Sequence, residues 1–203
     1  MTFKDTLLQQ ALELFKKNGI KQYTENDIAK ALDVSQSTFN DFFKDKEDLL
    51  IQAVKMQTLL DRERQKQMLM KAENAMEELM MLVQDALESL KGVNPKYFAE
   101  IFEYPSIQKY SFGELENYSY PMIHNILNKG VQQGVFLRDI NIAVVTRVII
   151  ENINVLLNTR VFPPEKYSLR EVYRSIYLYY FRGLCSTEAI ASAERLFTKS
   201  ILA

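Results

Sequence analysis

Apolar residues recur along most of the chain at intervals of three and four, the spacing that places side chains on one face of an α-helix. The first such stripe ends at Asn18-Gly19 and is formed by Leu7, Leu8, Ala11, Leu14 and Phe15. Only six Gly and five Pro occur in the 203 residues, and most of them lie between periodic stretches. The pattern predicts an all-α protein with about nine to ten helices.

A helix, a tight turn and a second helix are predicted directly after the first stripe. Thr24 and Asp27 have the spacing of a capping pair, which opens a helix over about residues 25–32. Ser35 can cap the helix that follows the turn, and Asp45 can cap the next one. Three helix starts therefore lie close together in this part of the sequence.

The helix that begins after Ser35 has one apolar and one polar face. Phe39, Phe42 and Phe43 lie at i, i+3 and i+4, so we expect them to pack inward. The outer face is left to Gln36, Ser37, Asn40 and Asp41. One packed helix followed by one presented helix is the geometry of a helix-turn-helix, whose second helix enters the DNA major groove.

The stretch LLQQALELFKKNGIKQYT, followed after three residues by IAKALDVSQSTFNDFFKDKEDLL, contains a set of residues at fixed spacings. The set consists of Ala11, Phe15, Gly19, Thr24, Ile28-Ala29, Val34-Ser35, Thr38, Phe43, Lys46-Glu47 and Leu49. This arrangement resembles the amino-terminal domain of the TetR family of bacterial transcriptional regulators. The resemblance implies a helix-turn-helix DNA-binding domain at residues 1–46 and a ligand-sensing and dimerisation domain at residues 47–203.

The resemblance also implies which side chains meet an operator in double-stranded DNA. Some would read base edges, where Gln and Asn can pair with adenine, and others would hold phosphates. Two positions depart from the family's usual residues, with Ser37 in place of Gly and Asn40 in place of Tyr. The predicted DNA-binding residues are Thr24, Ser35, Gln36, Ser37, Thr38, Asn40 and Lys46.

Net charge contributes little to DNA binding in this region. Residues 1–50 contain seven Lys, no Arg and nine Asp or Glu, which leaves a net charge of −2. Much of nonspecific DNA affinity comes from neutralising phosphates. An alternative therefore stays open, in which the chain is a ligand-binding or protein-interaction module of the same fold with weak or lost DNA binding.

Beyond residue 91 the helical pattern is interrupted before it resumes. Asn94-Pro95 predicts a capped helix start, while residues 106–120 fit either a loop or a broken helix. The helices predicted at about residues 141–158 and 168–182 are apolar over more than one stripe. Such helices need a second partner, which can be the protein's own core or another subunit. The resemblance implies the second, a homodimer formed through the last two large helices.

Methionine and aromatic residues are frequent in the middle of the sequence, where they can line an apolar cavity for a small-molecule effector. The same stripe is typical of ordinary core, so both interpretations stay open. Polar residues within apolar patterns need partners, in the protein or in a ligand. The candidate pocket residues are Met80, Tyr97, Phe98, Phe102, Tyr110, His124 and Asn152.

No pattern indicates an enzyme. His124 is the single histidine of the sequence, which excludes His-based triads and multi-histidine metal sites, and no phosphate-binding glycine loop or CxxC occurs. Acidic pairs such as Glu100 and Glu103 have the spacing of solvated helix faces. We therefore predict no catalysis, no cofactor and no metal site.

Composition points to a cytoplasmic protein. The net charge is −1, Cys185 is the single cysteine, and no apolar run approaches the roughly 18 residues of a membrane span. We expect no membrane partner.

Overall fold

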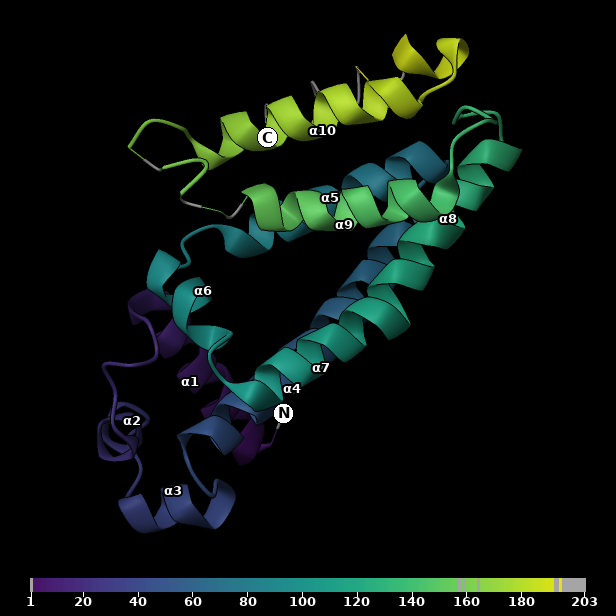
Figure 1. Ribbon diagram of the computed structural model, residues 1–203. Helices are drawn as coiled ribbons and strands as arrows, with labels where there is room; N and C mark the ends of the chain where they lie inside the picture. The colour runs from purple at the N-terminus through teal and green to yellow at the C-terminus, as the bar shows by residue number, and fades with distance from the viewer. Residues whose placement is uncertain (1, 157, 159, 164, 192–193, 195–203) are drawn as a thin grey trace. The chain divides into compact units, whose positions relative to one another are not determined.

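Helices make up nearly all of the regular structure in the computed structural model, which describes residues 2–156, 158, 160–163, 165–191 and 194 (Figure 1). The helices of the described residues are α1 (Phe3–Asn18), α2 (Glu25–Ala31), α3 (Gln36–Phe42), α4 (Lys46–Leu69), α5 (Ala75–Leu90), α6 (Pro95–Ile101), α7 (Pro105–Glu114), a π-helical turn η1 (Leu115–Ser119), α8 (Tyr120–Gln132), α9 (Ile142–Leu156) and α10 (Leu169–Leu184). The prediction of an all-α protein with nine to ten helices is confirmed.

Capping residues begin the first helices, among them the predicted Thr24 and Ser35. Thr2 and Thr24 each form a capping box, with Asp5 and Asp27 respectively. The Ser35 hydroxyl accepts a hydrogen bond from the Thr38 backbone N–H at 3.0 Å. Because these side chains satisfy N–H groups that a helix end leaves unpaired, they fix where each helix starts.

The first of two compact units consists of Met1–Gln67 and Leu90–Glu114, and it therefore contains α1 to α3, all but the last two residues of α4, and α6 and α7. Phe15, Phe39 and Phe43 are fully buried at its centre. Side chains from α6 and α7, including Tyr97 and Ile107, belong to the same core. The apolar core that supports the helix-turn-helix thus extends past residue 46 into two helices far along the chain.

The second unit consists of Met68–Ser89 and Leu115–Ala203, with α5, η1, α8, α9 and α10. Phe136 is 1% exposed, and its ring lies over Gly130 of α8, where an added Cβ would be only 2.1 Å from a ring carbon. The adjoining backbone is held by an isolated β-bridge between Phe136 and Cys185. The Tyr177 hydroxyl of α10 donates to the Ile149 carbonyl of α9 at 3.2 Å.

The segment that fits a loop or a broken helix is helical. α7 continues through η1 into α8, and Pro121 lies in the first turn of α8. A proline within a regular α-helix loses one hydrogen bond and clashes with the preceding turn, so the wider π-helical turn just before it accommodates the ring. The sequence also predicts a last helix from Thr187 to about Ser200. Residues 187–191 and 194 are helical, and the other residues of this stretch lie outside the described ones.

Candidate DNA-binding surface

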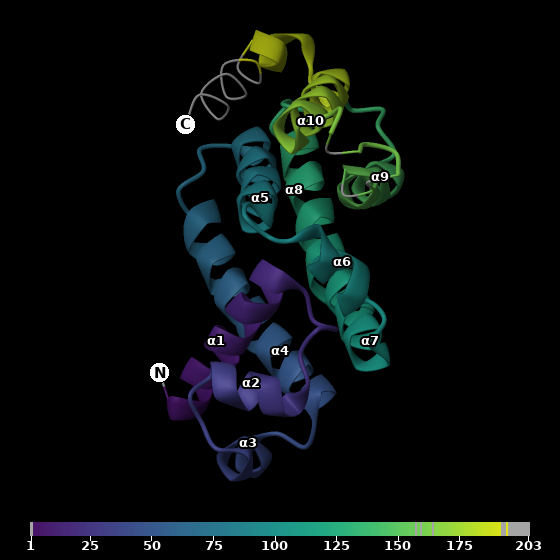
Figure 2. The ribbon, with the colours of Figure 1, turned by 90° about the vertical axis from the view of Figure 1, so that its left-hand side faces the viewer.

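α3 lies at the outer end of the first unit, beyond α1 and α2, in both Figure 1 and Figure 2. Phe39 and Phe43 anchor it in the core, and Phe42 packs on Phe3 with ring centroids 5.8 Å apart. The opposite face exposes Ser37 and Asn40 to solvent. The periodicity of the sequence therefore determined correctly which face of this helix is presented.

Two predicted base-reading residues are joined to each other on α3. The Gln36 Nε2 donates to Asn40 Oδ1 at 3.0 Å, across one helical turn. The hydroxyls of Ser35 and Thr38 are 2.8 Å apart at the start of the same helix. These contacts restrict the side-chain rotamers on the exposed face of α3.

A surface hollow of about 680 Å³ adjoins the start of α2 and α3. Predicted DNA contacts from three elements, Thr24, Gln36 and Lys46, line it together. Its other lining residues are Lys21, Tyr23, Glu25 and Asn26. The fold thus brings Thr24 and Lys46 to the same hollow, although they are 22 positions apart in the sequence.

Lys46 occupies a position that sequence reasoning did not anticipate. Its ammonium donates to the carbonyls of Tyr23 at 2.9 Å and Ile20 at 3.3 Å, while its backbone N–H donates to Glu25 at 3.1 Å. Two of the three ammonium hydrogens are therefore used to fix the loop between α1 and α2, here residues 19–24. A phosphate contact by Lys46 stays a prediction, and the observed geometry gives this side chain a structural task.

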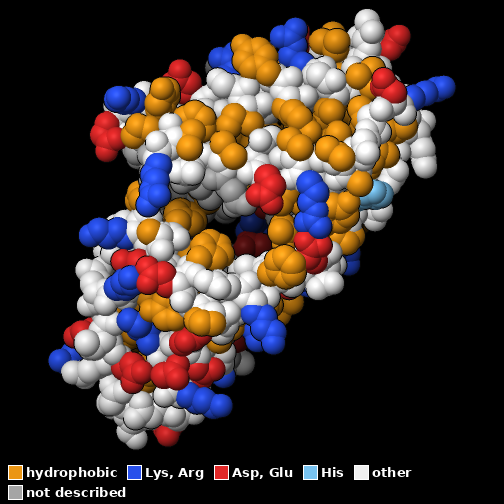
Figure 3. Space-filling model, in the orientation of Figure 1, with side chains coloured by type: hydrophobic (Ala, Val, Ile, Leu, Met, Phe, Trp, Pro, Cys, Tyr) orange, Lys and Arg blue, Asp and Glu red, His pale blue; other side chains and the backbone are white. Residues whose placement is uncertain are grey.

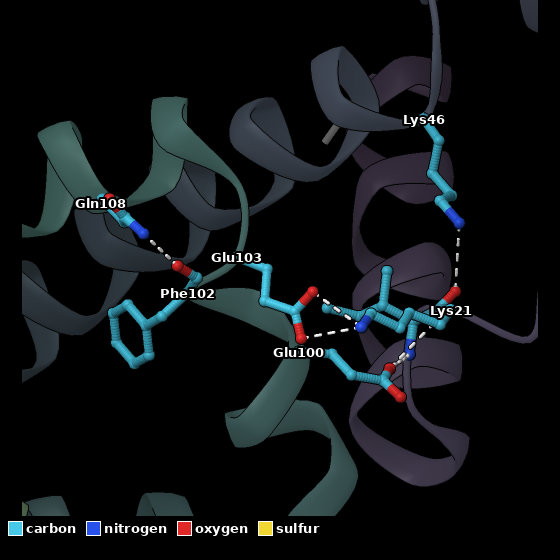
Figure 4. A network of polar contacts seen from close by, with 7 residues as sticks. Lys21, Lys46, Glu100, Phe102, Glu103 and Gln108 are labelled. Carbon is cyan, nitrogen blue, oxygen red and sulfur yellow. Dashed lines mark hydrogen bonds and ion pairs between the residues drawn. The ribbon is translucent and has the colours of Figure 1, made fainter.

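The same loop is held from its other side by α6 (Figure 4). The Glu100 carboxylate accepts hydrogen bonds from the backbone N–H groups of Ile20 at 2.5 Å and Lys21 at 2.9 Å. Gly19, with φ +92°, leaves room for this approach, because a Cβ there would be 3.2 Å from Glu100. The loop that leads into α2 is thus fixed by Lys46 at its carbonyls and by Glu100 at its N–H groups.

Electrostatics favour the ionised forms at this junction. Burial alone raises the pKa of Glu100, but the backbone donors of Lys21 and Ile20 and the nearby lysines lower it below its ordinary value overall. Glu103 raises the pKa of Lys21 by accepting its hydrogen bond, with Lys21 Nζ 2.7 Å from one carboxylate oxygen. The interpretation of Glu100 and Glu103 as a solvated face missed both contacts, because nothing in local spacing indicates which loop lies across from a helix.

The candidate pocket residues are divided between the two units. Tyr97 is buried in the core of the first unit, where burial raises its pKa, whereas Phe102 is 52% exposed. Tyr110 has the ammonium of Lys55 over its ring at 5.6 Å.

In the second unit Met80 is buried, and His124 lies 3.0 Å from the Asn128 amide. Phe98 packs against the first core and Asn152 is half-buried on α9, so the effector site stays a prediction.

Apolar side chains gather over α9 and α10 on the face shown in Figure 3. Exposed apolar side chains of these two helices include Val144 at 56% and Val155 at 42% on α9, and Tyr179 at 66% on α10. Arg147 on α9 forms a two-point ion pair with Glu116 at 2.6 and 2.9 Å and stacks over the Tyr120 ring. The apolar surface on α9 is therefore flanked by an ordered charged group.

The described part of the chain contains no cluster of three or more His, Cys, Asp or Glu side chains arranged for a metal ion. Among the described helices, none combines the length and the apolar character that crossing a membrane would require.

Comparison with known proteins agrees with this geometry. The family model of bacterial regulatory proteins of the tetR family matches residues 7–53. The fatty acid metabolism regulator protein of Bacillus subtilis (strain 168) is 23% identical over 173 residues, which are 84% of this chain and 89% of that protein.

Solved structures share the fold over most of the chain. The transcriptional regulator FadR from Bacillus subtilis, in complex with stearoyl-CoA, has a TM-score of 0.70 and 23% identity, covering 88% of this chain and 98% of its own. A protein from Saccharomonospora viridis in complex with choline has a TM-score of 0.79 and 20% identity, covering 90% and 97%. Residues 7–53 therefore match the model of the tetR family, and most of the chain shares the fold of these solved structures.

Proposed function

We propose that this protein is a homodimeric, ligand-responsive repressor that binds an inverted-repeat operator in the cytoplasm. The observation that carries the proposal is the outward polar face of α3, anchored by Phe39 and Phe43 and matched by the family model. A helix held in this way can enter a major groove without rearranging its own core.

Base reading falls to the linked pair of Gln36 and Asn40, with Ser37 beside them. Their amide groups suit adenine, whose N6 and N7 offer a donor and an acceptor. Thr24, Ser35 and Thr38 lie at or near helix starts, where hydroxyls and backbone N–H groups can hold phosphates. Lys46 supports these contacts by fixing the loop that leads into α2.

Dimerisation is assigned to α9 and α10. Their exposed apolar side chains, among them Val144 and Tyr179, form the kind of surface that another subunit covers. A twofold dimer places two copies of α3 on one side of the DNA, which requires half-sites about 34–36 Å apart and hence an inverted repeat.

The effector is a small molecule, and a fatty acyl-CoA is the first candidate to test. The support is the similarity to the Bacillus subtilis regulator, which was solved with stearoyl-CoA and covers most of this chain. An effector of this kind acts only if its affinity differs between the DNA-binding and the released conformations.

The experiment is selection of bound fragments from random-sequence DNA, followed by titration of the selected duplex at several salt concentrations. An enriched inverted repeat whose affinity falls with salt supports the proposal. Stearoyl-CoA is then added to the complex, with coenzyme A alone as the control. Release by the acyl form only would support the ligand class.

The second candidate is a module of the same fold with weak or lost DNA binding. The net charge of −2 over residues 1–50 favours it, since few positive charges are present to neutralise phosphates. No enrichment from protein shown to be folded and dimeric would support this candidate over the repressor.

A further inference from the structure

The side chain of Lys21 lies at the hollow that holds three predicted DNA contacts, yet the family resemblance assigned it no role. It lines that hollow together with Thr24, Gln36 and Lys46. Its ammonium is paired with Glu103 at 2.7 Å, and no other side chain of the hollow is paired with a residue from the α6–α7 link in the described structure. A positive charge beside the predicted phosphate contacts is thus neutralised by an acidic residue from elsewhere in the chain.

Both partners of this ion pair are held in place by backbone contacts. Glu100 binds the N–H of Lys21, and Lys46 binds the carbonyls on either side of it. Glu103 lies on the link between α6 and α7, where the Gln108 side chain donates to the Phe102 carbonyl (Figure 4). The Lys21–Glu103 ion pair therefore depends on the position of this link relative to the loop before α2. Both segments belong to the same compact unit.

We propose that the Lys21 ammonium can bind a DNA phosphate when it is not paired with Glu103. Glu103 therefore lowers the affinity of the protein for DNA. The proposal rests on the DNA-binding function proposed above. The side chains of Lys21 and Glu103 are 56% and 54% exposed, so their pairing is weak enough to be exchanged for a phosphate. Displacement of the α6–α7 link would separate the two groups and add a positive charge to the DNA-facing surface.

The test compares Glu103→Gln with the unaltered protein on the selected operator and on a random-sequence duplex. Removing the carboxylate should tighten binding to both DNAs by about threefold, since a released exposed pair is worth up to about fivefold. It should also steepen the dependence of log K on log salt by about 0.9, because one more phosphate is neutralised. A phosphate contact carries no sequence information, so the two DNAs should respond alike.

Two further variants separate this mechanism from a general change of charge. Glu13→Gln on the exposed face of α1 adds the same charge away from Lys21 and should leave the salt dependence unchanged. In a Lys21→Gln background, Glu103→Gln should lose its advantage over Glu13→Gln. If Glu103→Gln and Glu13→Gln have equal effects in protein that binds its operator, the proposed role of Glu103 is wrong and the proposed repressor function still stands. Absence of DNA binding by every variant would overturn both proposals.

Discussion

The two units of the chain are held together by different kinds of contact. In the first unit, the Glu100 carboxylate binds backbone N–H groups 79 and 80 residues earlier in the sequence. In the second, the Phe136 ring fills the space left by Gly130. A charged contact can open with pH or with competing ions, whereas a ring packed over a glycine tolerates almost no change in volume.

The units also differ in what they leave exposed. The outer helix of the first unit presents short polar side chains, which suit hydrogen bonding to DNA. The helices α9 and α10 expose Val144, Val155 and Tyr179. A partner copy is proposed to cover the α9–α10 surface, and the three variants below test how the two units differ.

The largest effect is expected for Gly130→Ala. A Cβ at this position would lie 2.1 and 2.3 Å from two carbons of the Phe136 ring, so the ring must move. We expect the free energy of unfolding to fall by about 3 kcal/mol, as for other overpacked cores. Urea denaturation followed by circular dichroism measures the loss.

The control for Gly130→Ala is the double variant with Phe136→Leu, which removes the crowded ring carbons. If crowding is the cause, the two changes should be less destabilising together than their separate losses predict. If the losses in unfolding free energy of the two single variants simply add in the double variant, crowding between a Cβ at residue 130 and the Phe136 ring is not the cause.

The next effect concerns the dimer. Val144→Glu places a carboxylate on the proposed interface of both copies, so we expect the dissociation constant to rise about 100-fold or more. Sedimentation equilibrium measures it. Val161→Glu is the matched control, since Val161 is similarly exposed, at 51% against 56%, but precedes α10 on the connecting loop. A dimer that is equally weakened by both changes would argue against the α9 surface.

The smallest effect is expected for Glu100→Ala. Losing the charge-assisted hydrogen bonds to Ile20 and Lys21 should cost about 1–2 kcal/mol of unfolding free energy near neutral pH. Glu103→Gln, on the neighbouring exposed ion pair with Lys21, should cost less than Glu100→Ala, because solvent-exposed ion pairs contribute little to stability.

The difference in unfolding free energy between the unaltered protein and Glu100→Ala should become smaller as the pH falls. The pKa of Glu100 is lower in the folded protein than its ordinary value of 4.5. Its contribution is therefore complete above about pH 4.5 and is lost as the pH falls through the lower folded value. Denaturation curves at several pH values should show the unaltered protein and Glu100→Ala converging in acid. A constant difference would mean that the carboxylate charge is not what holds the loop.

The sequence by itself determined the helix starts and the orientation of α3. Capping at Thr24 and Ser35 depends on residues three positions away, and the inward face of α3 follows from the spacing of Phe39 and Phe43. Because these signals involve residues close together in the sequence, they can be recognised without the tertiary structure. The same locality explains why the resemblance to the TetR family is carried by the first quarter of the chain.

Only the tertiary structure decided what Lys46 and Glu100 do. Both are charged residues on helices and look like solvent-facing or DNA-facing groups in the sequence, yet each fixes the backbone of the loop before α2. The helical course of residues 106–120 was likewise open until the π-helical turn was seen before Pro121. Partners that meet across 20 to 80 residues leave no periodic signal, because the backbone groups they bind are the same in every amino acid.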